Sequence, residues 1–467
     1  VFSIKSLYCD KKGSLWIGTY YNGVNHIDRS YNQFNNYSYA GYSKGLSAKV
    51  VSSFEERPDG SIWIGTEGGG LNYFNPETRK FKTLNTKSGF INPLSGTNVK
   101  DLLFDGEYLW VGLFNEGLNR ISPDGKAIKY YFHDPTVENS ISSNNVYSLL
   151  REDEKLWIAT YGGGLNVLDL NDGKFTNYQS NPNNPKALSS DLSRVLLKTR
   201  RGEIWIGTEI GLNRVWRDND GMPIDFETIL PKEKIYALQE DSQGNLWIGT
   251  ISNGAYMYNP INKDLLHYTV EDGLAGNTVF GILEDVNGLI WLSTNSGLSK
   301  FNTEERLFTN YDRSNGLENL EYNFNAYFKS SDGQLYFGGV DGFTVFDPAE
   351  IKSNTYIPPV VFTDLSQNNR QLEIGGDILK QSINETEQIY FDYNNANFTI
   401  QFAALDFSSP NHNHYAYKLE GIDQEWNNAI GKTEATYTIQ REGDYLFRLK
   451  GGNSEGLWNE NERSLKI

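Results

Sequence analysis

Leu15-Trp16-Ile17-Gly18-Thr19 is one copy of a five-residue pattern that recurs along the chain and decides its fold. The pattern returns at residues 62–66, 109–113, 156–160, 204–208, 246–250 and 290–294, and in degenerate form at residues 335–339. Each tryptophan, replaced by Tyr336 in the last copy, follows the previous one by 42 to 48 residues. An internal period of this length is typical of repeat architectures, in which each repeat is one supersecondary unit.

Residues 50–84 show what one repeat contains. Residues 50–56 predict a first strand, Pro58-Asp59-Gly60 a turn, and residues 61–66 a second strand. The three glycines at 68–70 tolerate positive φ and predict another turn, with further strands at 71–75 and 81–84. Four antiparallel strands in about 45 residues predict one blade of a β-propeller, with the tryptophan of the second strand packed between neighbouring blades.

The number of blades depends on how the ring closes. Eight sets of the first three strands can be counted, and the last ends at Asp347-Pro348 without an outer strand. A strand predicted at residues 33–39 can complete that last blade. Residues 31–350 are then a seven-bladed propeller and residues 1–30 the last blade of a preceding propeller; a single eight-bladed ring is the alternative. Because the chain begins inside a strand-like segment, we expect it to be a piece of a longer protein.

The repeat stops after Pro348, and Ile357-Pro358-Pro359 predicts a stiff linker. Seven strand-like runs follow, at residues 360–365, 388–393, 398–404, 414–420, 436–440, 445–450 and 464–467. This number of short strands predicts an immunoglobulin-like β-sandwich over residues 351–467. Tyr415, Tyr417 and Tyr445 fall on one side of a sheet, where we expect them to form the sandwich core; a dimer surface is the alternative.

The composition excludes several kinds of partner. A formal net charge of −17 repels phosphate backbones and anionic lipid, so nucleic acid is not expected, whereas a neutral ligand such as a sugar is compatible with it. Cys9 is the single cysteine, so the chain forms no internal disulfide. No apolar run approaches the roughly 20 residues that span a membrane, and the mean hydropathy is −0.54. The fold class expected is all-β, with no direct membrane contact in this segment.

The Trp-Ile-Gly-Thr units and their Gly-Gly-Gly-Leu-Asn turns resemble two-component regulator propeller repeats. Residues 415–426, with residues 443–448, resemble the Y_Y_Y domain that follows such propellers. This resemblance implies the periplasmic sensor region of a hybrid two-component histidine kinase of the Bacteroidetes type. Such proteins carry two seven-bladed propellers, the sandwich, a transmembrane helix and cytoplasmic kinase and regulator parts. They sense oligosaccharides, control glycan-utilisation genes, and are thought to dimerise through the sandwich. Most of a first propeller, the helix and the kinase are absent from this sequence.

The candidate ligand residues come from the loops between second and third strands. These loops gather on one face of a propeller near its axis, which is the default ligand site. Sugars need flat aromatic faces for their C–H surfaces and amide or carboxylate groups for their hydroxyls. We therefore predict ten ligand-binding residues: Tyr20, Tyr21, Asn22, Glu67, Phe114, Asn115, Glu116, Tyr161, Glu209 and Asn253. Polar loops with no ligand are the alternative interpretation.

No catalytic residue, cofactor or metal site is predicted. The glycine-rich turns lie between two strands, so they lack the strand-to-helix context of a phosphate loop. Asp241-Ser-Gln-Gly-Asn-Leu-Trp247 is expected to fix a hairpin, and His412 with His414 lacks further ligands for a metal. Glu67, Glu116 and Glu209 could share one face, which keeps a propeller glycan hydrolase or lyase open as an alternative. A protein-interaction scaffold is the third function class.

Overall fold

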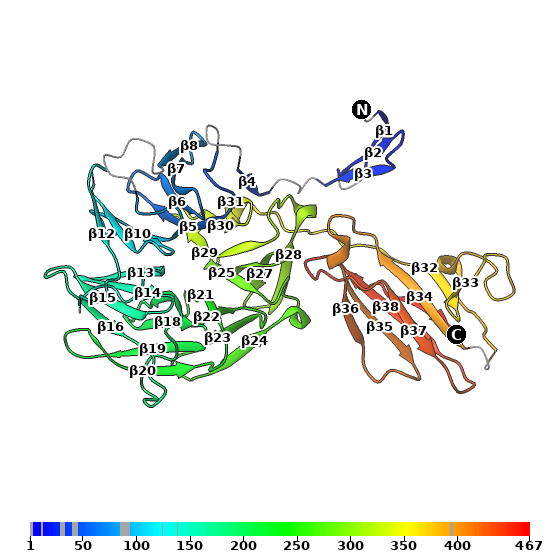
Figure 1. Cartoon of the computed structure of the whole chain (residues 1–467). Helices are drawn as coiled ribbons and strands as arrows, with labels where there is room; N and C mark the ends of the chain where they lie inside the picture. Colours follow the sequence, from blue (N-terminus) through cyan, green and yellow to red (C-terminus); the bar gives the residue numbers. More distant parts are fainter. Residues whose placement is uncertain are drawn as a thin grey trace. The chain divides into compact units, whose positions relative to one another are not determined.

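The computed structural model describes residues 3–10, 13–28, 33–39, 45–84, 94–123, 125–137, 139–392 and 396–467. Almost all of its regular structure is antiparallel sheet, so the all-β prediction is confirmed. The chain divides into two compact units (Figure 1). One comprises Asn32–Ile351, and the other combines Val1–Tyr31 with Lys352–Ile467.

Seven four-stranded sheets form the described part of Asn32–Ile351, and each is one propeller blade. The first three blades consist of β5 (Val51–Glu56), β6 (Ile62–Thr66), β7 (Gly70–Asn75) and β8 (Lys80–Leu84); β9 (Val99–Phe104), β10 (Leu109–Leu113), β11 (Leu118–Ile121) and β12 (Ile128–Tyr131); and β13 (Val146–Glu152), β14 (Lys155–Thr160), β15 (Gly164–Asp169) and β16 (Phe175–Tyr178).

The next three blades consist of β17 (Ser193–Lys198), β18 (Ile204–Thr208), β19 (Gly211–Arg217) and β20 (Pro223–Ile229); β21 (Ile235–Glu240), β22 (Leu246–Thr250), β23 (Ala255–Tyr258) and β24 (Leu265–Tyr268); and β25 (Val279–Glu284), β26 (Ile290–Thr294), β27 (Gly297–Asn302) and β28 (Leu307–Tyr311). Short 3-10 turns η1 (Val270–Asp272) and η2 (Arg313–Asn315) follow the fifth and sixth blades.

The seventh blade joins both ends of the propeller unit. It contains β29 (Tyr322–Lys329), β30 (Leu335–Gly339) and β31 (Gly342–Phe346), and its outer strand is β4 (Asn35–Tyr37). In the β31–β4 pair, Phe343 stands opposite Tyr37, and their rings stack with centroids 5.0 Å apart. The first strands of the blades contact one another around the ring, with β29 against β5, and so line the central channel (Figure 1).

The tryptophans of the repeat pack between blades, as the sequence predicted. Trp110, Trp205 and Trp291 are completely buried. Trp110 lies in one apolar cluster with Ile158 of the next blade, and Trp205 lies in another with Leu246. Burying a large aromatic ring at each seam contributes several kcal/mol per blade on the usual area scale, roughly 2–3 kcal/mol per ring.

An aspartate in the turn before the second strand holds several of these tryptophans. Asp241 Oδ2 accepts the Trp247 Nε1–H at 3.0 Å, and Asp285 does the same for Trp291. Asp241 Oδ1 also accepts the backbone N–H of Asn245 at 2.8 Å. The expectation that residues 241–247 fix a hairpin is therefore confirmed.

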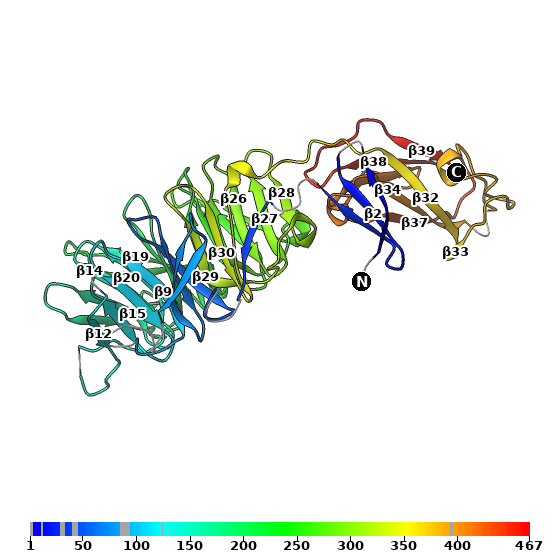
Figure 2. The same ribbon diagram turned by 90° about the horizontal axis from the view of Figure 1, so that it is seen from above.

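The second unit contains a three-stranded sheet and the sandwich (Figure 2). The three-stranded sheet is β1 (Ile4–Cys9), β2 (Leu15–Thr19) and β3 (Val24–Ile27). The sandwich has two four-stranded sheets, one with β33 (Arg370–Gln371), β32 (Val360–Gln367), β34 (Asn397–Ala404) and β37 (Glu434–Thr438), the other with β36 (Asn427–Ile430), β35 (His414–Glu420), β38 (Leu446–Gly452) and β39 (Arg463–Lys466). The turns η3 (Pro348–Glu350), η4 (Ile383–Glu385) and η6 (Pro410–His412) complete the regular structure of the described C-terminal residues.

The tyrosines of the sandwich lie where the core interpretation placed them. Tyr415 and Tyr417 are buried in the core, and Tyr445 packs against it. The Tyr415 hydroxyl oxygen accepts the backbone N–H of Ala404, which fastens one sheet to the other. The strand predicted at residues 388–393 is wrong over its described part, 388–392. Gln388 forms one isolated bridge with Lys466 there, and residue 393 lies outside the described residues.

Candidate functional site

The first strand of each of the first six blades carries a one-residue bulge near its start. In β13, Val146 pairs with Thr160 and Ser148 pairs with Ala159, which leaves Tyr147 without an opposite residue on β14. The corresponding positions in the other five blades are Ser52, Lys100, Arg194, Tyr236 and Phe280. A bulge re-aims the side chain of the extra residue, and bulges are common beside binding sites.

The seventh blade departs from this pattern by a longer insertion. In β29, Tyr322 pairs with Gly339 and Tyr327 pairs with Phe337, so that residues 323–326 are left unpaired. Asn323 Nδ2 donates to Val51 O of the first blade at 2.9 Å. Asn325, at φ 62°, donates to backbone oxygens of the second and third blades at 3.3 and 3.2 Å. The insertion therefore reaches across the channel to three other blades.

Phe324, at the centre of the insertion, is surrounded by the bulge residues. Its ring stacks on Tyr147 with centroids 5.8 Å apart and meets Tyr236 edge-on at 5.6 Å. The Lys100 ammonium lies 5.2 Å and the Arg194 guanidinium 5.3 Å from its centroid. We call these five residues, Lys100, Tyr147, Arg194, Tyr236 and Phe324, the mouth cluster. Side chains from five different blades thus meet at one end of the channel.

Four of the ten predicted ligand residues surround this cluster. Glu67 accepts a hydrogen bond from Lys100 Nζ at 2.7 Å, and Glu209 accepts one from Arg194 Nε at 2.5 Å. The Tyr161 centroid lies 4.9 Å from the Arg194 guanidinium carbon, and Phe114 meets Tyr147 edge-on at 6.1 Å. The four residues, Glu67, Phe114, Tyr161 and Glu209, form the rim of the mouth.

The structure places three further predicted residues elsewhere in the propeller. Asn115 is in a left-handed turn at φ 66°, and its N–H donates to Asn145. Glu116 is exposed in the same turn, and its backbone oxygen accepts from Ser95. Asn253 donates to Glu233 and to the Tyr256 hydroxyl, both at 2.8 Å, in a separate polar cluster.

The remaining three predicted residues lie in the other compact unit, in the turn between β2 and β3. Tyr20 and Tyr21 expose 56% and 88% of their surface, and their rings meet edge-on at 4.4 Å. The backbone N–H of Asn22 donates to Thr19. Lys5, at the bulge of β1, lies 4.7 Å from the Tyr20 ring, which repeats the pairing of a basic bulge residue with an aromatic rim residue. The rim of the mouth consists of propeller residues and does not include these three.

Two carboxyl groups on the first strands of the first two blades have raised pKa values. Burial raises the pKa of Asp101 to about 7, although backbone N–H groups of Leu102 and Leu149 and nearby polar side chains oppose this rise. Burial likewise raises the pKa of Glu55 to about 8, and the nearby Asp101 adds to the effect. Both side chains are half-buried. Burial also raises the pKa of Tyr147 and of Tyr236, while Arg194 opposes the rise.

The mouth cluster was not predicted from the sequence, although a signal for it exists. Lys100 lies ten residues before Trp110, Tyr147 ten before Trp157, and Arg194 eleven before Trp205. Aligning the repeats on their tryptophans, with one residue of latitude, would have shown a basic or aromatic side chain at this position in five of the first six blades. Phe324 has no such signal, because it belongs to an insertion found in the last blade.

Among the residues that the structure describes, no group of three or more histidine, cysteine, aspartate or glutamate side chains could hold a metal ion. No helix in the described part of the chain is long and apolar enough to cross a membrane. Burial, together with the nearby His412, lowers the pKa of His414.

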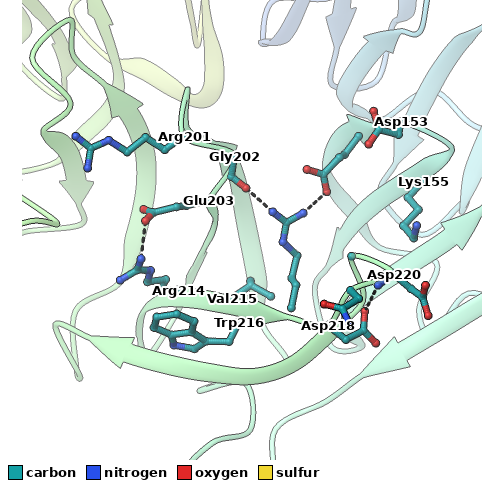
Figure 3. A pocket seen from close by; sticks show the side chains of 14 residues that line it. Asp153, Lys155, Arg201, Gly202, Glu203, Arg214, Val215, Trp216, Asp218 and Asp220 are labelled. Atoms are coloured by element: carbon teal, nitrogen blue, oxygen red, sulfur yellow. Dashed lines mark hydrogen bonds and ion pairs between the residues drawn. The ribbon is translucent and has the colours of Figure 1, made fainter.

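A hollow lies between turns of the third and fourth blades and has a volume of about 550 Å³ (Figure 3). Asp153 and Lys155 stand on one side of it, and Arg201 and Glu203 on the other (Figure 3). Glu203 pairs with Arg214 at 2.5 Å. Charges of both signs line this hollow, and none of the ten predicted ligand residues does. The channel mouth is therefore the better candidate.

Family models match two parts of the chain. The two component regulator propeller matches residues 3–21, 45–68, 229–252 and 273–296, and the Y_Y_Y domain matches residues 406–467. The chain thus carries both the repeats and the domain that its sequence resembled.

A histidine kinase and solved extracellular domains are both similar to this chain. Histidine kinase P4 of Formosa agariphila is 36% identical over 301 residues, which is 62% of this chain and 22% of that protein. The extracellular domain of a hybrid two component system of B. thetaiotaomicron is 25% identical with a TM-score of 0.73. The alignment covers all of this chain and 61% of that structure. A second such extracellular domain from the same organism, 20% identical with a TM-score of 0.56 over 99% of this chain and 62% of its own, shows the same fold.

The chain therefore spans about a fifth of the curated kinase and about three fifths of the solved extracellular domain. It is similar to part of a histidine kinase, and the solved structures that it resembles are extracellular domains of hybrid two component systems.

Proposed function

We propose that this chain is the periplasmic ligand-sensing region of a hybrid two-component histidine kinase, tethered to a transmembrane helix in the full-length protein. It binds an oligosaccharide at the channel mouth and signals across the membrane to control glycan-utilisation genes. In this proposal the region itself catalyses no reaction, and the sandwich mediates a homodimer.

The observation that carries the proposal is the mouth cluster with its rim. Phe114, Tyr161 and Phe324 are each partly exposed there and offer ring faces or edges to the C–H surfaces of a sugar. Glu67 and Glu209 offer oxygen atoms to hydroxyl groups. Aromatic surface combined with a few fixed polar groups is the usual lining of a small-ligand site.

The course of the chain suggests how binding could be transmitted. Phe324 belongs to β29 of the seventh blade, and from that blade the chain continues through η3 into the sandwich. A ligand that contacts Phe324 therefore acts on the blade that leads directly to the signalling domain. The ligand changes the conformation of the receptor only if it has different affinities for two arrangements of this connection.

Titration calorimetry of the chain against partial digests of plant and host glycans tests the proposal. Saturable heat with one digest, without new products by chromatography, is the expected result. Steady release of product would replace it with the hydrolase or lyase alternative. The carboxylates favour binding without release of product. Glu67 and Glu209 each neutralise a basic side chain, and they stand on different blades.

A further inference from the structure

The mouth concentrates positive charge in an otherwise acidic protein. The chain has 59 acidic and 42 basic residues, yet Lys100, Arg194 and Lys234 meet at one end of the channel. Their ion-pair partners are Glu67 and Glu209, the latter 2.5 Å from Arg194 and 3.3 Å from Lys234. Three cations thus share two carboxylates at the rim. The overall charge favoured a neutral ligand, but the local charge has the opposite sign.

Arg194 is held in a fixed orientation with most of its donors uncommitted to carboxylates. Its side chain is 11% exposed, and its Nε binds Glu209. The guanidinium carbon lies 4.5 Å from the Tyr236 centroid and 4.9 Å from the Tyr161 centroid, with Tyr147 and Phe324 at 5.2 and 5.3 Å. These rings fix the plane of the guanidinium but provide no second carboxylate. A planar group with five N–H donors, held in place beforehand, suits a carboxylate or sulfate group.

Lys100 provides a second cation at the same aromatic surface. Its side chain is 8% exposed, and one of its three N–H groups donates to Glu67. The ammonium lies between 5.2 and 5.6 Å from the centroids of Phe114, Tyr147 and Phe324. Lys100 and Arg194 therefore both face Phe324 and Tyr147, and an anionic group above these rings would meet both cations.

We propose that the sensed ligand is an acidic oligosaccharide, whose carboxylate or sulfate group binds between Lys100 and Arg194 while its sugar ring packs on Phe324. This inference rests on the proposed function and adds the chemical class of the ligand. Lys234, 53% exposed at the rim, adds long-range attraction that salt weakens.

The test compares acidic and neutral ligands on the whole chain by titration calorimetry. The acidic probes are partial digests of pectin, alginate and carrageenan, each beside its carboxyl-reduced or desulfated counterpart; the neutral probes are digests of xylan, arabinan and laminarin. Binding to an acidic digest that is lost after reduction or desulfation supports the inference. Binding to a neutral digest, or equal binding to a neutralised counterpart, overturns it and leaves the proposed function standing. Absence of binding to every digest overturns both.

Substitutions at the mouth test where the anionic group of the ligand binds. The double variant Arg194→Met with Glu209→Gln removes one ion pair without leaving a buried charge, and it is expected to weaken binding of the acidic digest about tenfold or more. Lys234→Met changes an exposed side chain that folding does not need, so it is expected to reduce the salt dependence of binding and to weaken it about threefold at low salt. Lys174→Met removes an exposed Lys–Asp pair elsewhere on the propeller and serves as the matched control. Unchanged affinity in both mouth variants would overturn the inference.

Discussion

Replacing Asp241 with alanine is expected to destabilise the propeller by about 3 kcal/mol. The Asp241 side chain accepts four hydrogen bonds, from Gln243, from both nitrogens of Asn245 and from the indole of Trp247. Three of these donors, the two nitrogens of Asn245 and the Trp247 Nε1–H, are buried and would lose their acceptor, at about 1 kcal/mol or more each. The Gln243 N–H is only partly buried and can turn to water, so its contribution is smaller.

The fourth blade allows the opposite experiment. Its turn has the same backbone hydrogen bonds, with Thr199 in the place of Asp241, and the Trp205 Nε1–H has no hydrogen-bond partner. Thr199→Asp would provide that partner. We expect the free energy of unfolding to rise by about 1 kcal/mol. This is the usual net contribution of such hydrogen bonds once the cost of burying the carboxylate is subtracted.

Calorimetric melting of the propeller measures both changes. At roughly 2 °C per kcal/mol for a domain of this size, Asp241→Ala should lower Tm by about 6 °C and Thr199→Asp should raise it by about 2 °C. Asp172→Ala, in an exposed turn, is the control and should shift Tm by about 2 °C or less. A loss smaller than that of the control for Asp241→Ala, or a lower Tm for Thr199→Asp, would refute the idea that the turn carboxylate stabilises the blade through its tryptophan.

Three further outcomes are expected. Because the raised pKa values of Glu55 and Asp101 make the folded protein bind more protons than the unfolded chain from about pH 5 to 8, stability should fall as pH rises through this window, and Glu55→Gln should flatten the decline in Tm. Phe324→Leu should lower ligand affinity about tenfold with a small change in Tm, since it keeps apolar volume but loses the ring face; unchanged affinity would remove Phe324 from the site. Tyr415→Phe should destabilise the sandwich by about 1–2 kcal/mol in urea unfolding, because it leaves the buried Ala404 N–H without an acceptor.

The repeat pattern predicted the blades because the apolar residues that recur in each copy are the residues that the fold buries. Strand β6, for example, contains Ile62 and Ile64 in the core and ends at the turn that begins with Gly68, which has φ 88°. Tandem copies of such a unit leave few alternative folds. The sandwich was harder to predict, because its strands do not repeat. The run at residues 388–392 has the alternation of a strand but finds one bridging partner, Lys466, at the sheet edge.

The rim residues were predicted and the mouth cluster was not, for a physical reason. Glu67 and Glu209 follow the second strands directly, where the repeat places a loop on the axial face. Lys100 and Arg194 sit inside the first strands, where strict alternation assigns side chains to one blade face or the other. The bulge breaks that alternation by one residue and turns these side chains into the channel. Strict alternation therefore predicts the wrong side-chain direction for Lys100 and Arg194.

The ion pairs at the mouth are weak contributors to folding stability. A buried pair such as Arg194 with Glu209 gives up hydration that its attraction seldom returns, and apolar side chains of similar volume would stabilise the channel at least as well. Other bulge positions show that the repeat accepts such side chains, since Tyr236 and Phe280 occupy them. Charge is retained at Lys100 and Arg194, beside aromatic rings that could have filled the space alone. Its placement there is better explained by a ligand that must be recognised than by the stability of the ring.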